Sequence, residues 1–179
     1  MNKKKFLPFL LSLGIVALDQ FTKYLVVKNV QLGTIAKKIF GDFIWICHVR
    51  NTGAAFSLGA DGSVFGRIVI LIVFPIALMV FVAYLVVTSK DYLNNAQRWF
   101  AAGILGGGVG TIIDRIFRFD TGVVDFISIK VYGLFGMDRW PTFNISDSCV
   151  VIFVILLAIS MVFSKENSKE SPKDKEAKK

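Results

Sequence analysis

The sequence contains few of the residues that bind metals or form disulfides. Its 179 residues include two cysteines, Cys47 and Cys149, and one histidine, His48. They form neither a disulfide framework nor a set with metal-ligand spacing, so we interpret them as ordinary packing residues. The chain also lacks a glycine-rich phosphate loop between a strand and a helix, and it lacks an internal repeat. The sequence therefore predicts no metal and no cofactor.

Charged residues are absent from residues 68–87, in a chain that is 54% hydrophobic and contains 17 phenylalanines. About 20 apolar residues suffice to cross a bilayer as a helix. Residues 6–27 follow three lysines and resemble a signal peptide, but Asp19, Thr22 and Lys23 occupy the place of a cleavage site. We therefore expect an uncleaved first span. The sequence predicts four spans, at about 6–27, 68–87, 99–115 and 143–163.

The formal net charge of +8 does not indicate a nucleic-acid-binding face, because the basic residues flank the spans. Four spans place both termini, the segment between the second and third spans, and six lysines between residues 165 and 179 on one side. Lys28, Lys37, Lys38 and Arg50 lie on the other side, where basic residues are less dense. The positive-inside rule then puts both termini in the cytoplasm.

The predicted loops at 28–67 and 116–142 contain signs of structure. Residues 43–49 are rich in β-branched and aromatic side chains, which is typical of a strand in a small sheet. Residues 131–135 and Trp140 carry rings of the kind favoured at a lipid interface. Glycines four apart in the third span predict close helix packing. Residues 164–179 are polar and predict a disordered cytoplasmic tail after a domain at 1–163.

Polar residues gather at the outer level of three predicted spans. The first and third spans run outward and the fourth runs inward. Ionisable groups at a span centre cost about 2.5 to 3.5 kcal/mol on insertion scales, so they mark function by default. The residues at this level are Asp19, Lys23, Asp114, Arg115, Asn144 and Asp147.

Charge pairing gives a structural explanation for some of these residues. Asp19 and Lys23 are four apart on one helix face and can neutralise each other, and Asp114 can pair with Arg115 or with a distant base. Asp147 has no basic residue within two turns along its span. Pairing therefore leaves Asp147 unexplained.

Asp125 is the candidate partner of Asp147. It lies in the apolar string Val-Val-Asp-Phe-Ile at 123–127, whereas Asp120 lies on a more polar turn. Two carboxylates held close together cannot both ionise, so such a pair holds one proton. The charged member can then take a proton from water while the protonated member polarises a scissile carbonyl. This chemistry is typical of peptide hydrolysis.

Five ordered motifs resemble those of lipoprotein signal peptidase, also called signal peptidase II, over nearly the whole chain up to the tail. Each motif alone is a weak signal, and together they are a strong one. The motifs are Asp-Gln-Phe-Thr-Lys at 19–23, Asn-Thr-Gly-Ala-Ala-Phe at 51–56, the segment 106–115, Val-Val-Asp-Phe at 123–126, and Phe-Asn-Ile-Ser-Asp at 143–147.

The resemblance implies an all-α polytopic membrane protein with four transmembrane helices and a small extracytoplasmic β-rich cradle. It implies an aspartyl endopeptidase of the bacterial inner membrane that cuts diacylglyceryl-modified prolipoproteins before the lipidated cysteine. The enzyme would work in contact with membrane lipid, as a monomer without nucleic acid, and globomycin-type peptides would inhibit it. The implied catalytic residues are Asp125 and Asp147, and the implied supporting residues are Asp19, Lys23, Asn51, Asp114, Arg115 and Asn144.

The chain departs from the family pattern at three places. Thr111 stands where the family usually has Asn, and Ser146 stands where Ala is common. The interval between Asp114 and Asp125 is longer than usual, so the assignment of Asp125 rests on its motif rather than on spacing. Two other functions stay open: a small proton-coupled transporter, since intramembrane carboxylates also relay protons, and a membrane scaffold that uses the glycine-rich span.

Overall fold

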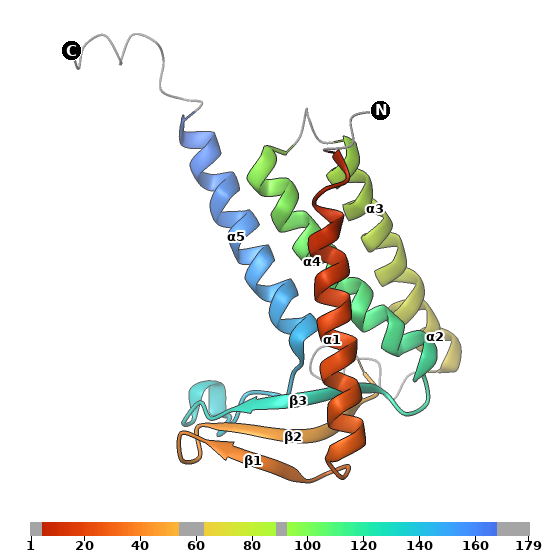
Figure 1. The fold of residues 1–179 in the computed structure, drawn as a ribbon, viewed down its shortest axis with the longest axis vertical. Helices are drawn as coiled ribbons and strands as arrows, with labels where there is room; N and C mark the ends of the chain where they lie inside the picture. The colour runs from red at the N-terminus through yellow and green to blue at the C-terminus, as the bar shows by residue number, and fades with distance from the viewer. Residues whose placement is uncertain (1–4, 54–62, 89–92, 168–179) are drawn as a thin grey trace, which may run out of the picture.

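In the part of the chain that the structure describes, four helical segments are long and apolar enough to cross a membrane, and a small sheet lies at one end of them (Figure 1). The computed structural model describes residues 5–53, 63–88 and 93–167, with side chains described up to residue 164. The spans are α1 (Phe9–Asn29), the continuous segment Val64–Thr88, α4 (Asn95–Phe117) and the part of α5 (Ile145–Asn167) up to Ser164. The four predicted spans are confirmed, with ends shifted by a few residues.

The second span consists of three helical pieces in direct succession. They are α2 (Val64–Ile68), the π-helical turn η3 (Val69–Val73) and α3 (Phe74–Thr88). The N–H of Phe74 donates to Val69 O, five residues back. Pro75 has no N–H to continue a regular α-helical ladder, and a wider turn of this kind accommodates the break. Residues of this irregular stretch also line the candidate active site.

Helix α4 is the centre of the bundle and packs against α1, α3 and α5. In the most apolar stretch of α4, 61% of residues are buried, whereas in that of α5 only 6% are buried. The outer surface of α5 is apolar and exposed. Glycines permit this close packing: a Cβ on Gly106 would lie 2.9 Å from Ser12 Cα, and one on Gly107 would lie 2.6 Å from Ser146 O. The predicted packing role of the glycine-rich span is confirmed.

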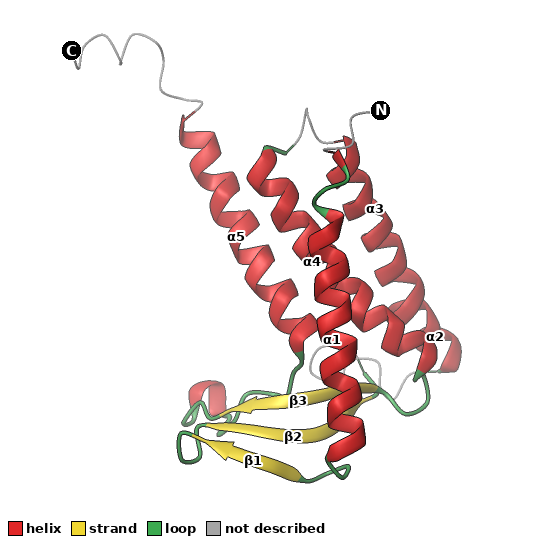
Figure 2. Cartoon of the chain, viewed as in Figure 1, coloured by secondary structure: helices red, strands yellow, loops and turns green. Residues whose placement is uncertain are grey.

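The sheet has three antiparallel strands in the order β1-β2-β3 (Figure 2). They are β1 (Ile35–Ile39), β2 (Ile44–Asn51) and β3 (Val123–Ile129). The strand predicted at 43–49 is confirmed as β2. Its partner β3 comes from the other predicted loop, so the sheet joins the two segments that connect the spans at this end.

An apolar cluster fixes the sheet to the bundle. Val26 near the end of α1 packs with Val124 and Phe126 of β3, and Ile145 of α5 packs against the same cluster. After β3 the chain forms the short 3-10 helix η4 (Leu134–Gly136), where Tyr132 and Phe135 are largely exposed. Their position at a lipid interface stays a prediction.

The helix ends show how the chain is threaded. α1 begins and α5 ends at the end of the bundle away from the sheet (Figure 1). α5 continues to Asn167, past the predicted end of the domain at residue 163. The rest of the predicted tail, residues 168–179, and the motif residues 54–56 lie outside the described residues.

Candidate active site

Asp125 lies on the strand that passes closest to the bundle. It belongs to β3 and pairs with Val49 of β2. Only 3% of its surface is exposed, and Val123, Val124 and Phe126 around it are buried as well. Asp120 lies exposed in the turn before the strand. The structure thus separates the two aspartates as the apolar frame of Asp125 predicted.

Asp147 lies in the first turn of α5, where a capping box fixes it. The Asn144 side-chain oxygen accepts from the Asp147 N–H at 3.0 Å, and the Asn144 N–H donates to Asp147 Oδ2 at 3.1 Å. Reciprocal bonds of this kind satisfy the otherwise unpaired N–H groups at the start of a helix. The carboxylate is also favoured there because a helix N-terminus carries partial positive charge.

Asn144 connects the two carboxylates. Its side-chain Nδ2 donates to Asp125 Oδ1 at 2.7 Å, while its Oδ1 and backbone N–H hold Asp147. Asn144 is fully buried. One residue therefore orients a carboxyl group on β3 through its side chain and another on α5 through its backbone N–H, and this is the polar centre of the site.

Asp125 lies outside the spans, and its pKa is raised to about 7. Burial of the carboxyl group is the main cause, and the negative charge of Asp147 acts in the same direction. Hydrogen bonds from Asn144 and Asn51 act in the opposite direction. A carboxyl group with a pKa near neutrality can donate or accept a proton at physiological pH.

Both carboxylates open into a cavity of about 490 Å³ between the helices and the sheet. Asn51, Thr111 and Arg115 also line it. Most of the remaining wall is apolar and comes from three spans. Its helix residues include Leu71, Pro75, Met79, Ile112, Val150 and Val151.

A buried ion network lies beside this cavity. Lys23 Nζ lies 2.7 Å from Asp19 Oδ2 and 2.8 Å from Asp114 Oδ2, and all three side chains are fully buried. Asp19 Oδ1 also accepts from the Ser146 N–H at 3.0 Å. The network therefore ties α1 and α4 to the first turn of α5, next to Asp147. The predicted pairing of Asp19 with Lys23 is confirmed, and Asp114 is a third member.

Asp114 pairs with the distant base Lys23 rather than with its neighbour Arg115. Besides Lys23 it forms an ion pair with Arg118, one helical turn further on. The Arg115 guanidinium instead donates to two backbone carbonyls, Asn51 O at 2.9 Å and Gly53 O. Of the two partners considered for Asp114, the distant base is correct, because consecutive helix residues point in different directions. Arg115 fixes the end of β2 at the cavity.

The sequence prediction missed several polar contacts of the site. Gln20 donates to Asp19, Gly110 O and Asp114 and so bridges α1 and α4, and Arg118 also approaches it. The Asn-x-x-Asp spacing of Asn144 and Asp147 was an available signal for the capping box. Among the residues that the structure describes, no three His, Cys, Asp or Glu side chains gather as a metal site would require.

Known proteins with similar sequences cover most of the chain. A family model described as "Signal peptidase (SPase) II" matches residues 11–163. The lipoprotein signal peptidase of Treponema denticola is 44% identical over 164 residues, which cover 90% of this chain and 93% of the relative. The protein of the same name from Borrelia garinii subsp. bavariensis is also 44% identical, over 92% of this chain and 94% of its own length.

The fold has a solved counterpart as well. A bacterial membrane enzyme solved by the in meso method at 2.3 Å resolution superposes with a TM-score of 0.75 at 30% identity, with 92% of each chain covered. A second such enzyme, at 1.9 Å resolution, gives a TM-score of 0.70 at 29% identity. The range matched by the family model includes the three strands and both aspartates, Asp125 and Asp147. The chain belongs to the signal peptidase II family.

Proposed function

We propose that this chain is an aspartic endopeptidase that removes the signal peptide from diacylglyceryl-modified prolipoproteins and cuts immediately before the lipidated cysteine. The observation that carries the proposal is the Asn144 amide, which holds Asp125 and Asp147 at the same cavity. The family match supports the substrate class.

In the proposed reaction the two aspartates share one proton, which we place on Asp125 because its pKa is raised to about 7. Asp147 takes a proton from water as the water oxygen bonds to the scissile carbonyl carbon. Asp125 gives its proton to the carbonyl oxygen, which would otherwise develop negative charge. When the C–N bond breaks, the leaving amine takes a proton from Asp147, and the carbonyl forms again as its proton returns to Asp125. The pair ends with one proton, as it began.

The surroundings of the two carboxylates fit a membrane-embedded substrate. The apolar wall contributed by η3, α3, α4 and α5 can accommodate an apolar signal segment and acyl chains without leaving unpaired polar groups. The buried ion network of Lys23, Asp19 and Asp114 supports the site from beside the cavity. Arg115 holds Asn51 in place at the edge of the cavity. These are positioning roles, because the carboxylates of Asp125 and Asp147 are the groups proposed to touch the reacting atoms.

The proposed enzyme is a monomer in the bacterial inner membrane. Its termini lie in the cytoplasm, because the basic residues are denser at that end, and its sheet lies on the extracytoplasmic side. The carboxylates then meet the substrate at the outer leaflet. Globomycin-type peptides are proposed to inhibit the enzyme by occupying the same cavity.

Substitution of each aspartate tests the assignment. Asp125→Asn and Asp147→Asn should each abolish cleavage of a lipidated precursor by purified enzyme, while Asp120→Asn, an exposed neighbour, should keep it. Substantial cleavage by either of the first two variants would show that Asp125 and Asp147 are not the catalytic pair.

Wild-type enzyme should cleave the lipidated precursor and spare the same precursor without lipid. Equal cleavage of the two would contradict the proposed specificity.

A further inference from the structure

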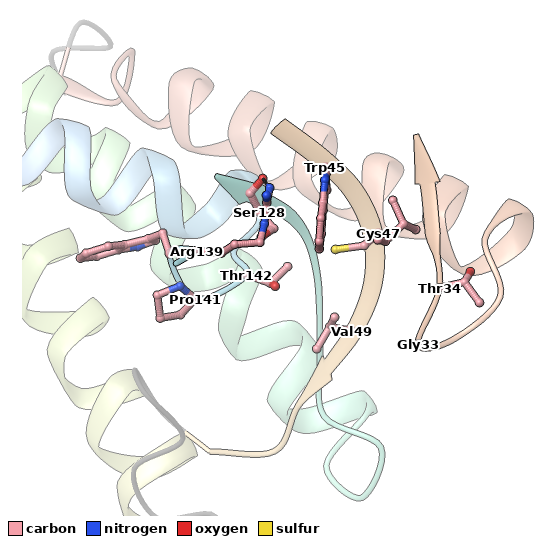
Figure 3. Close-up of a pocket in the computed structure, with 11 residues that line it drawn as sticks. Gly33, Thr34, Trp45, Cys47, Val49, Ser128, Arg139, Pro141 and Thr142 are labelled. Atoms are coloured by element: carbon pink, nitrogen blue, oxygen red, sulfur yellow. Dashed lines mark hydrogen bonds between the residues drawn. The ribbon is translucent and has the colours of Figure 1, made fainter. Parts of the chain in front are cut away.

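A second cavity lies over the sheet, next to the proposed active site (Figure 3). It has a volume of about 400 Å³, within the range of ligand-binding pockets. Trp45, Cys47 and Val49 of β2 line it, in the part of the strand where the register shifts between Ile46 and Val49. Arg139 and Thr142, from the segment after β3, line it as well. We call this space the sheet cavity.

The polar wall of the sheet cavity is held in place. The Arg139 guanidinium carbon lies 3.6 Å from the centroid of the Trp45 ring system, so the two side chains stack. Arg139 also donates to Ser128 Oγ, Ser128 O and Asp42 O, each at 2.9 Å. These contacts use the fork-like geometry of the guanidinium and leave only 13% of the side chain exposed. The cavity is therefore formed before any ligand arrives.

The sheet cavity adjoins the cavity of the two aspartates, and the two share part of their walls. Trp140, Pro141 and Thr142 line both of them. This segment lies between β3, which carries Asp125, and α5, which carries Asp147. A substrate chain bound at the carboxylates would therefore extend in two directions. One part would lie among the apolar helices, and the other would cross this segment onto the sheet.

The two cavities are both lined mostly by apolar surface, and they differ in where they lie relative to the spans. The one at the aspartates is walled by apolar residues of three spans. The sheet cavity lies outside the spans and presents an indole, a guanidinium and a threonine hydroxyl. An apolar signal segment is stable only among the spans, because polar surroundings would expose it to water. The polar part of the substrate, which follows the cleaved bond, would then lie outside the spans, on the side of the sheet cavity.

We propose that the sheet cavity binds the first residues of the mature segment, directly after the lipid-modified cysteine. This inference rests on the proposed function and deepens it. It assigns part of the substrate specificity to residues of the mature segment, which remain after the signal peptide is removed. The enzyme would then recognise its precursor on both sides of the scissile bond. The sheet would act as a binding surface for peptide as well as a support for Asp125.

A pair of substrates tests the proposal. Both contain the same signal segment and the same diacylglyceryl-modified cysteine. The first continues for several residues of mature sequence, and the second ends at the cysteine as an amide. We expect the purified full chain to cleave the longer substrate with a kcat/KM at least about tenfold higher, equivalent to ~1.4 kcal/mol of binding in the transition state.

Two tryptophan variants of β1 locate the effect. Ile35 lines the sheet cavity and is partly exposed, so Ile35→Trp adds bulk inside it. Lys37 is exposed on the same strand and is not among the residues that line the cavity. Ile35→Trp should reduce the ratio of kcat/KM for the longer substrate to that for the shorter one, and Lys37→Trp should keep it. Partial misfolding would lower both rates together and leave the ratio unchanged.

The outcomes separate this inference from the proposed function. Equal kcat/KM for the two substrates with the wild-type enzyme would overturn the sheet cavity as a peptide site and leave the peptidase intact. A ratio that Ile35→Trp leaves at the wild-type value would also overturn it. Cleavage of neither substrate would overturn the proposed function and this inference with it.

Discussion

The side-chain amide of Asn144 donates a 2.7 Å hydrogen bond to Asp125, across the boundary between the sheet and the helices. The same residue begins α5 and forms a capping box with Asp147. The relative position of the two carboxylates therefore depends on one buried residue, which holds Asp125 by its side chain and Asp147 by its backbone N–H as well. Asn144 has two separable tasks, to cap a helix and to orient Asp125.

The two tasks of Asn144 can be separated by substitution. Asn144→Ser keeps a good N-cap residue but loses the amide that reaches Asp125. We expect cleavage of the lipidated precursor to fall by about 2- to 10-fold, because a hydrogen bond between neutral groups contributes about 0.5 to 1.5 kcal/mol. Thermal unfolding in detergent should change little.

Ser148→Ala is the matched control, because the Ser148 hydroxyl donates to Asn144 O in the same turn and contacts neither carboxylate. It should leave cleavage near the wild-type rate. Wild-type activity in Asn144→Ser would show that the amide does not position Asp125.

The raised pKa of Asp125 predicts how stability depends on pH. Unfolded Asp125 loses its proton near the ordinary aspartate pKa of 3.8, whereas the folded protein keeps it up to about pH 7. Between these values the folded state binds more protons than the unfolded state, so stability should fall as pH rises from about 4 to 7. Asp125→Asn should remove this part of the slope. Melting temperatures in detergent at pH 5 and pH 8, compared between wild type and variant, provide the measurement.

The same proton predicts the alkaline limb of the activity profile. If Asp125 donates it to the scissile carbonyl, kcat/KM for the lipidated precursor should fall as pH rises through about 7. Asp120→Asn should show the same profile as wild type. A rate that stays constant from pH 6 to pH 9 would contradict the assignment of the proton to Asp125.

The buried ion network predicts a large effect for one lysine. Lys23→Met leaves Asp19 and Asp114 buried without their shared cation, and breaking a buried pair in this way costs about 3 to 5 kcal/mol. We expect a lower melting temperature and reduced cleavage, because Asp19 also holds the Ser146 N–H beside Asp147. Lys28→Met, at an exposed position in the last turn of the same helix, is the control and should melt like wild type.

Composition and local pattern were sufficient to predict the spans and β2, because a span needs a long apolar run and β2 is rich in β-branched and aromatic residues. They could not predict the partner of Asp114. Lys23 is distant in the sequence and meets Asp114 only when α1 packs against α4. The strand β1 gave little signal, since four of its five residues are exposed. The sheet cavity arises from four separate segments, and no local pattern encodes it.

Glycines of the spans offer a last test, because two of them differ in what surrounds them. A Cβ on Gly110 of α4 would lie 2.9 Å from Asp19 Oδ2 and would also meet the Ser146 hydroxyl, whereas a Cβ on Gly14 of α1 would meet nothing within 4 Å. Gly14→Ala should therefore stabilise the protein slightly, since alanine favours helices over glycine by up to ~1 kcal/mol. Gly110→Ala should push α1 and α5 away from α4 and lower both the melting temperature and cleavage of the lipidated precursor. If the two variants melted alike, the approach of Asp19 to the first turn of α5 would not depend on Gly110.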